Sequence, residues 1–248
     1  ITDVAKEKGF LLTLFSTSHS REEALSMIEK VITAHVDGAI IFDDQLGPED
    51  VKKIASYNVP SIVIDNKLSG DKVGNISFSY DAELKKVIEN YYAKGGDKVM
   101  TFLHVHNAGR LLNRCEKTFI ETHKALGKSY NVINCDDSYT HTYADFREYF
   151  ETHKKAYLIA YRDSIAAAVE NAATDSGLSV PEDVEVVSLV GTKYANIVRP
   201  TLTAMHIDMS EVGKRAMYML TDLMAQNLVD KQAKFEAHFV EGQSTIKR

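Results

Sequence analysis

Short apolar runs rich in β-branched residues alternate with amphipathic helical stretches along nearly the whole of this 248-residue chain. Such an alternation is typical of parallel sheets whose strands are joined by crossover helices. The chain is 44% hydrophobic and 26% charged, which are ordinary globular proportions. The sequence therefore predicts an α/β fold arranged as one large domain or two modest ones.

The first third of the chain predicts one set of strands. Ser20 and Glu23 form a capping box ahead of apolar residues at helical spacing, and Gly47-Pro48 marks the start of a further helix. The strands expected here are Phe10–Ser16, Gly38–Phe42, Pro60–Asp65 and Asn75–Ser79.

After Ser79 the alternation begins again and predicts a second sheet. Helices are expected after Asp81 and after Asp208, where Asp208 and Glu211 form another capping box. No Pro/Ser-rich linker separates the two sets, so several short crossings should join the lobes. The remaining helices are expected at Leu111–Leu126, Thr142–His153 and Asp163–Thr174, and the strands at Lys98–His104, Asn131–Cys135, Ala156–Tyr161, Val184–Val190, Leu202–Ile207 and Lys234–Val240.

Composition excludes several classes of function. The formal net charge is -6, whereas a module that neutralises DNA phosphates needs a basic face. Cys115 and Cys135 lack zinc-ligand spacing and are interpreted as buried thiols in a reduced cytosol. No apolar run reaches the roughly 20 residues of a membrane span, so a soluble protein is expected. The chain opens inside a helical pattern, and what precedes Ile1 is left open.

No catalytic motif is present. GxSxG, HExxH, a phosphate loop and GxGxxG are all missing, so neither an enzyme nor a cofactor is predicted. His104 and His106 would share a strand face without a third ligand, and no metal site is expected. The acidic pairs Asp43-Asp44 and Asp136-Asp137 are interpreted as solvated turns.

Three stretches carry a resemblance to a known family. RDSIAAAVENAATDSGLSVPEDVEVVSLVG contains an Asp-x-x-Ala helix followed by Gly-Leu-x-Val-Pro-x-Asp-Val and a buried strand, RPTLTAMHIDMSEVGKRAMYMLTDLM contains a strand and a long helix, and STIKR closes the chain. In this order they resemble the lactose/galactose repressor family over nearly the whole sequence.

The resemblance implies a type I periplasmic-binding-protein-like fold. Two Rossmann-like lobes with parallel sheets would exchange the chain at three crossings and bind a small ligand between them. The N-terminal lobe would comprise residues 1–79 and 208–227, and the C-terminal lobe residues 80–207 and 228–248. The family has one more strand and a helix-turn-helix head before the stretch that opens here, so the sequence is expected to be a fragment.

Three candidate ligand-binding residues belong to the first lobe. By the resemblance, Phe42, Asp65 and Phe78 lie at the edge of its cleft, where Asp65 would accept ligand hydroxyls and Phe78 would face a ring. Asp65 is equally consistent with a turn or a cap ahead of Asn66. Phe78 is also consistent with ordinary core packing.

The other candidates include two departures from the family. Arg114 corresponds to an arginine that grips the ligand, although it also fits a solvated helix position one turn from Arg110. Arg162 stands where the family commonly has asparagine, and Val190 where it commonly has a ligand-binding aspartate. Two further positions, Ile207 and Met209, lie beside the ligand by resemblance and are equally consistent with packing. Asp163 is expected to be an N-cap.

The two departures predict an anionic effector such as a sugar phosphate or sugar acid. Val190 removes an acceptor and Arg162 adds a guanidinium near Arg114, and such a pair suits a carboxylate or phosphate. In the alternative, Arg162 pairs with Asp65 or Asp163 and the cleft binds weakly or not at all.

The resemblance favours the ligand-sensing core of a bacterial transcription regulator. In this interpretation a small effector, a sugar or a sugar derivative, alters a cytoplasmic homodimer that reaches DNA only through an N-terminal head absent from this chain. The alternative is the exported sugar-binding protein of a transport system, which shares the fold. A basic helix-turn-helix or a signal peptide ahead of the core would separate the two.

Residues 1–248 should have no measurable affinity for DNA by themselves, because the fragment is acidic, with a pI of about 5.9, and shows no recognition helix. A gel-shift assay at low salt, where phosphate contacts are strongest, checks this. Saturable, sequence-selective retardation would contradict the prediction.

Overall fold

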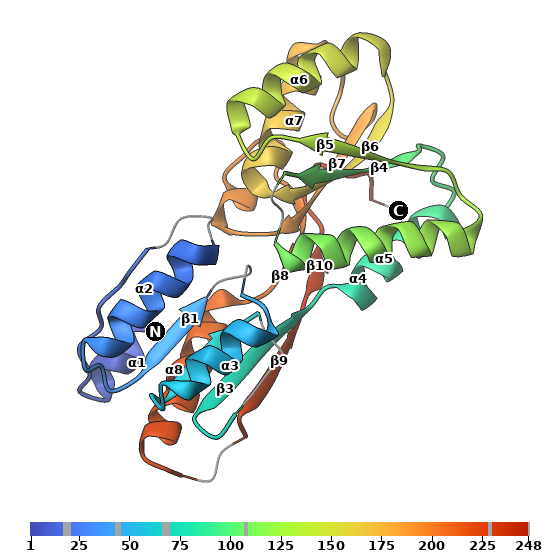
Figure 1. The fold of residues 1–248 in the computed structure, drawn as a ribbon. Coiled ribbons are helices and arrows are strands. Elements are labelled where there is room, and N and C mark those ends of the chain that lie inside the picture. Colours follow the sequence, from blue (N-terminus) through green and yellow to red (C-terminus); the bar gives the residue numbers. More distant parts are fainter. Residues whose placement is uncertain (17–20, 43–45, 66–69, 107–108, 228–229, 248) are drawn as a thin grey trace. The chain divides into compact units, whose positions relative to one another are not determined.

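The computed structural model describes residues 1–16, 21–42, 46–65, 70–106, 109–227 and 230–247 (Figure 1). The chain divides into two compact units, one formed by Ile1–Ser79 and Asp208–Glu236 and the other by Tyr80–Ile207 and Ala237–Arg248. The chain therefore passes between the units three times. Unit 1 and unit 2 denote these two bodies below.

Unit 1 contains a parallel sheet of four described strands in the order β1-β2-β3-β9. Its strands are β1 (Ala39–Phe42), β2 (Ser61–Ile64), β3 (Val73–Ser79) and β9 (Gln232–Glu236), and its helices are α1 (Thr2–Glu7), α2 (Arg21–Thr33), α3 (Pro48–Ser56) and α8 (Met209–Met224).

The helix-start signals of unit 1 have clear physical counterparts. Pro48 opens α3 after Gly47, whose N–H donates to the Asp50 carboxylate at 2.8 Å. Arg21 also donates to Asp50, at 2.9 and 2.5 Å, and this guanidinium holds the pKa of the carboxyl below its ordinary value. Asp208 caps α8 by accepting from the backbone N–H groups of residues 210 and 211. The expected cap at Ser20 lies outside the described residues.

The strand expected at Phe10–Ser16 is wrong. These residues are irregular, and Leu11 and Leu14 are 97% and 90% exposed. An apolar run becomes a strand only when a neighbouring strand satisfies its backbone and covers its side chains. Within the described part of unit 1, β1 is an edge of the sheet and pairs with β2 alone.

Unit 2 contains a sheet of six described strands in the order β10-β8-β7-β6-β4-β5, which is parallel except for β10. Helices α4 and α5 lie on one side of it and α6 and α7 on the other (Figure 1). The strands are β4 (Met100–Val105), β5 (Tyr130–Cys135), β6 (Ala156–Arg162), β7 (Val184–Val190), β8 (Thr203–His206) and β10 (His238–Val240), and the helices are α4 (Asp81–Ala93), α5 (Arg110–Leu126), α6 (Tyr139–Thr152), α7 (Asp163–Asp175) and the 3-10 helix η1 (Lys193–Asn196).

The single strand expected at Lys234–Val240 is two strands in different units. β9 pairs with β3 in unit 1, and β10 pairs with β8 in unit 2. The alternation of exposed and half-buried residues in β9 ends at Ala237, which is 6% exposed. The stretch that ends at Glu236 therefore belongs to unit 1, whereas we expected the C-terminal lobe from residue 228 onward.

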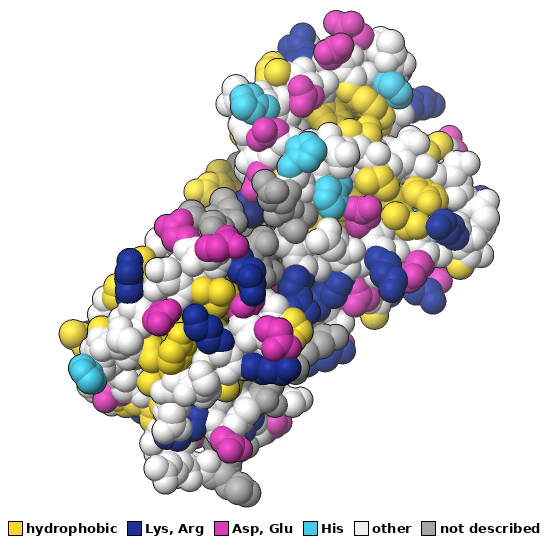
Figure 2. All heavy atoms as spheres, viewed as in Figure 1, with side chains coloured by type: hydrophobic (Ala, Val, Ile, Leu, Met, Phe, Trp, Pro, Cys, Tyr) yellow, Lys and Arg dark blue, Asp and Glu magenta, His cyan; other side chains and the backbone are white. Residues whose placement is uncertain are grey.

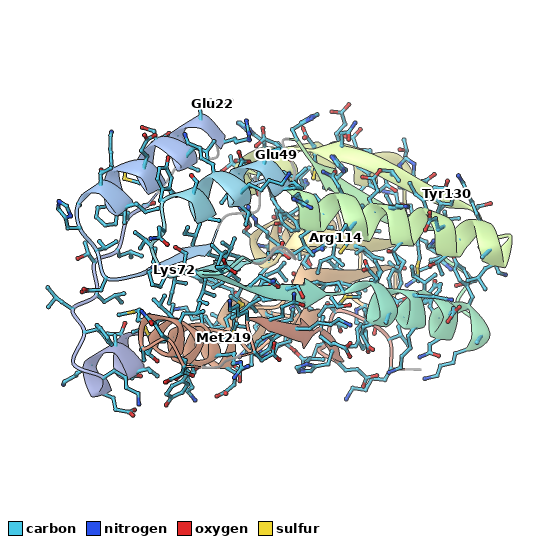
Figure 3. The ribbon with its side chains drawn as sticks, turned by 60° about the horizontal axis from the view of Figure 1, so that its bottom comes forward. Glu22, Glu49, Lys72, Arg114, Tyr130 and Met219 are labelled. Atoms are coloured by element: carbon cyan, nitrogen blue, oxygen red, sulfur yellow. The ribbon has the colours of Figure 1, made fainter. Side chains whose placement is uncertain are left out.

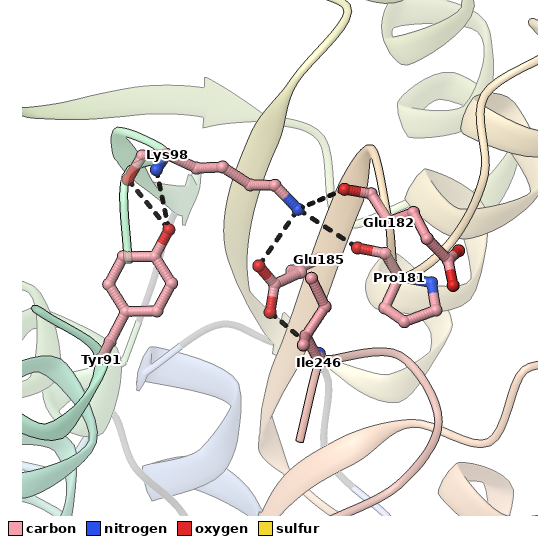
Figure 4. Close-up of polar contacts among 6 residues, drawn as sticks. All are labelled: Tyr91, Lys98, Pro181, Glu182, Glu185 and Ile246. Atoms are coloured by element: carbon pink, nitrogen blue, oxygen red, sulfur yellow. Dashed lines mark hydrogen bonds and ion pairs between the residues drawn. The ribbon is translucent and has the colours of Figure 1, made fainter. Parts of the chain in front are cut away.

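A buried ion pair joins the amino ends of β4 and β7 (Figure 4). The Lys98 ammonium lies 3.1 Å from Oε1 of Glu185 and donates to the carbonyls of Pro181 and Glu182 at 3.2 and 2.7 Å. Oε2 of Glu185 accepts from the backbone N–H of Ile246 at 3.0 Å. The ammonium group and the carboxylate are thus both paired and hydrogen-bonded, as buried charges need to be.

The closing Ser-Thr motif lies beside this ion pair. Oγ of Ser244 donates to the Val186 carbonyl at 2.6 Å and accepts from the Thr203 N–H at 2.8 Å. The hydroxyl groups of Thr203 and Thr245 lie 2.7 Å apart. Ser244 is fully buried, so its hydroxyl supplies backbone partners that an apolar side chain could not.

Three further features bear on function. Cys115 and Cys135 are free and buried, as expected, and burial raises the pKa of the Cys135 thiol to about 12. Among the described helices none is long and apolar enough to cross a membrane. On the face shown in Figure 2, basic and acidic side chains are intermixed.

Glu170 is a buried acid in the middle of α7. It is 1% exposed, and its Oε1 atom has no hydrogen-bond partner among the described residues. Burial raises the pKa of this carboxyl to about 8, so the folded protein holds the proton at neutral pH.

Glu170 should make the protein less stable as pH rises. The unfolded carboxyl titrates near its ordinary value of 4.5 and the folded one at about 8, so the folded state binds more protons between these values and stability falls across that window. Each unit of pKa difference corresponds to about 1.4 kcal/mol. Urea unfolding at pH 5 and pH 8 should show a smaller loss for Glu170→Gln than for the wild type. Glu148→Gln, at an exposed position of α6, is the control and should lose as much stability as the wild type. An equal change in the free energy of unfolding between pH 5 and pH 8 in all three proteins would contradict the prediction.

Candidate functional site

The parallel strands of unit 2 bring several polar side chains to one edge of the sheet. β4, β5, β6 and β7 run parallel, so their carboxyl ends meet at the same edge, which is where open α/β sheets bind ligands. Arg162 ends β6, Val190 ends β7, and Asp137 follows β5 by two residues. We refer to this region as the unit 2 edge.

An ion pair spans the unit 2 edge. Nη1 of Arg162 lies 2.8 Å from Oδ2 of Asp137, and the guanidinium lies 5.0 Å from the centre of the Tyr161 ring. Because β4 lies between β5 and β6 in the sheet, the pair reaches across the end of β4. Asp137 is an exposed bend residue, which agrees with the solvated turn that we expected, but it also forms an ion pair that we did not expect. It also takes the place of the two acids that the sequence offered as partners for Arg162.

Asp163 fastens the loop after β7 to the start of α7. Arg162 is the N-cap residue of this helix, so the N-cap expected at Asp163 is wrong. Oδ2 of Asp163 instead accepts from the N–H and the hydroxyl of Thr192, at 2.7 and 2.6 Å. Oδ1 is buried without a hydrogen-bond partner among the described residues. The residue that follows Arg162 is thus tied to the loop after β7.

Helix α5 contributes two further groups. Glu116 contacts Nδ1 of His104, which lies on β4. Arg114 lies near the start of α5 and is partly buried. Figure 3 labels it together with Tyr130, the first residue of β5, which follows the other end of that helix. In the described part of the chain, no group of three His, Cys, Asp or Glu side chains could hold a metal ion.

The remaining candidates, which lie at the second crossing and at the end of β7, are apolar. Ile207 is 4% exposed and packs as a core residue, whereas Met209, the first residue of α8, is 46% exposed. Val190 is half-buried and brings no side-chain hydrogen-bond acceptor to the unit 2 edge. These side chains can supply apolar contact but not polar recognition.

Unit 1 has a corresponding edge with an aromatic pair. Phe42 ends β1 and is 59% exposed, and its ring stands edge-on to that of Phe78 with centroids 6.1 Å apart. Asp65 follows β2, is 5% exposed, and has a left-handed φ of 58° that aspartate tolerates in turns. Asp65 is therefore a turn residue and also lies at the carboxyl end of a strand. The acidic pair Asp43-Asp44 lies outside the described residues.

Sequence reasoning missed two members of the unit 2 edge, Asp137 and Thr192. The available sign for Asp137 was its position, because the acidic pair 136–137 directly follows a strand. The first acid of the pair, Asp136, contacts His141 instead, with Oδ2 of Asp136 3.3 Å from Nδ1 of His141. No sequence motif marked Thr192.

Residues 88–245 match the family model described as the periplasmic binding protein-like domain. The chain belongs to this family. The match covers more than half of the sequence, and it confirms the resemblance to the effector-binding core of the lactose/galactose repressor family and the α/β fold class.

Curated relatives align with the whole of this periplasmic binding protein-like chain. Catabolite control protein A of Priestia megaterium is 22% identical over 252 residues, which are 100% of this chain and 76% of the relative. The HTH-type transcriptional regulator pepR1 of Lactobacillus delbrueckii subsp. lactis is 25% identical over 262 residues, covering 100% of this chain and 75% of the relative.

Solved structures share the fold. The dimeric Lac repressor superposes with a TM-score of 0.85 at 18% identity, covering 99% of this chain and 91% of the other. A LacI family transcriptional regulator from Arthrobacter sp. FB24 in complex with lactose gives 0.84 at 21% identity with the same coverage. Both pepR1 and the Arthrobacter protein are transcriptional regulators by name.

Proposed function

We propose that this chain is the effector-binding core of a LacI-type transcription regulator, located in the cytoplasm, and that a sugar-like metabolite is its effector. The observation that carries the proposal is the family match over residues 88–245, together with polar groups at the carboxyl ends of parallel strands. The Arthrobacter neighbour, which binds lactose by its description, supports the ligand class.

Each unit has its own candidate ligand contacts in this proposal. The Arg162–Asp137 pair and Arg114 are the polar contacts from unit 2, and Asp65 is the polar contact from unit 1. Phe42 is 59% exposed and offers an aromatic ring on which a sugar can pack, whereas Phe78 is 6% exposed and packs against Phe42 as a core residue. Val190, Ile207 and Met209 complete the proposed set with apolar contact.

The ion pair changes the argument for an anionic effector. That expectation required two guanidinium groups facing one acid, and Asp137 now opposes the charge of Arg162. A neutral, hydroxyl-rich ligand fits a balanced pair better than a phosphate does, because the phosphate would also approach the Asp137 carboxylate. We therefore propose a neutral sugar in place of the sugar phosphate or sugar acid.

A regulator is favoured over the exported sugar-binding protein. PepR1 and the Arthrobacter neighbour are transcriptional regulators by name. The alignment with pepR1 covers 100% of this chain and 75% of pepR1. Binding of the effector would change DNA affinity only if the effector prefers one arrangement of the core to another.

A neutral sugar should stabilise the protein, and Arg114→Ala should weaken binding about tenfold because it removes a charged donor. The measurement is a melting-temperature shift with glucose, galactose, xylose and lactose, followed by calorimetry on each sugar that binds. A ligand at 100 times its Kd adds about 2.7 kcal/mol of stability, which such a shift resolves. Arg147→Ala, an exposed arginine of α6, is the matched control. The proposal fails if no sugar raises the melting temperature, or if both alanine variants bind like the wild type.

The core should be a homodimer, as the Lac repressor neighbour is by its description. Size-exclusion chromatography with light scattering should give twice the chain mass of 27.7 kDa. Dilution of the sample then separates a specific dimer from concentration-driven association. A clean monomer at micromolar concentration would contradict this prediction.

A further inference from the structure

We infer that Asp137 and Arg162 act together as a neutral clamp for two adjacent hydroxyl groups, which makes Asp137 a residue that determines specificity for uncharged sugars over anionic ones. The inference rests on the proposed function and names the chemistry of its ligand. It starts from the 2.8 Å ion pair across the end of β4.

Both partners of the clamp can be reached by a ligand. The side chains of Arg162 and Asp137 are 41% and 29% exposed, so each keeps polar atoms at the surface while the pair is closed. By contrast, the Lys98–Glu185 pair has exposures of 5% and 0% and has no surface to offer. Only the first of these two pairs can bind a solute.

The clamp is held in position by its surroundings. Arg162 is fixed in the backbone as the N-cap residue of α7 and its guanidinium lies over the ring of Tyr161, which is 8% exposed. The carboxylate of Asp163, the next residue, accepts two hydrogen bonds from Thr192. A donor fixed in this way costs little ordering when a ligand binds.

The chemistry of the pair matches a vicinal diol. A guanidinium N–H donates to one hydroxyl oxygen, and the carboxylate accepts the proton of the neighbouring hydroxyl. The dianionic phosphate group of a sugar phosphate offers acceptors only, so where it takes the place of the diol it competes with Asp137 for Arg162 and is repelled by that carboxylate. Discrimination between sugar and sugar phosphate at this point therefore depends on Asp137.

Asp137→Asn tests this directly, because it keeps the size of the side chain and removes the charge that balances Arg162. Calorimetry with glucose, galactose, xylose and lactose and with glucose 6-phosphate and galactose 6-phosphate gives the ratio of neutral to anionic affinity. We expect the wild type to favour the neutral sugar. The ratio should move about tenfold or more toward the phosphate in Asp137→Asn.

Two further variants make the result specific. Asp136→Asn removes the same charge one residue earlier, where the carboxylate faces His141, and should leave the ratio at the wild-type value. Arg162→Gln leaves Asp137 unopposed and should move the ratio away from the phosphate. Far-ultraviolet circular dichroism and urea unfolding identify any variant that fails to fold, and either Asp137→Asn or Arg162→Gln alone is sufficient to decide the sign of the effect.

Each outcome has a separate meaning. If neutral sugars bind but Asp137→Asn keeps the wild-type ratio, the clamp is wrong and the proposed function stands. An equal shift in Asp136→Asn would reduce the effect to general charge and would also overturn the clamp. If none of the six probes binds the wild type, the proposed function fails and this inference fails with it.

Discussion

The buried ion pair between Lys98 and Glu185 fixes the amino side of the unit 2 sheet. It joins β4 to β7 and receives the backbone N–H of Ile246, so three distant parts of the chain meet at two charges. Removing one partner of such a pair costs about 3–5 kcal/mol, because it leaves the other charge buried and unopposed. The ion pair that stabilises the sheet thus lies at the amino ends of its strands. The carboxyl ends carry the Arg162–Asp137 pair, whose polar atoms a ligand can reach.

Much of the fold could be predicted from the sequence because local and tertiary preferences agree. The inner strands β6 and β7 of unit 2 are buried on both faces, and β6 is a nearly continuous apolar run that ends at Arg162. The failures have one cause, since pairing partners are not encoded locally. Residues 10–16 have the composition of a strand but lack a neighbour, and the run 234–240 is divided between two sheets at Ala237.

The candidate site shows the same limit more sharply. The resemblance to the family was sufficient to select Arg162, but its partner Asp137 follows β5, which lies on the far side of β4. That strand order cannot be read from the residues, so the pairing of Asp137 with Arg162 was not predicted. Asp163 was expected to cap α7, yet its carboxylate is bound by Thr192 from the loop after β7. Polar pairing across a sheet decides the charge that a ligand meets.

The interleaved path of the chain also has a consequence for synthesis on the ribosome. β3 in unit 1 completes its pairing only with β9, which ends at Glu236, and β7 in unit 2 is closed by contacts to Ser244 and Ile246. At about 5–20 residues per second, more than 150 residues are translated after β3 before its partner exists. Neither sheet can therefore be finished until the segment from Gln232 to Ile246 has left the exit tunnel.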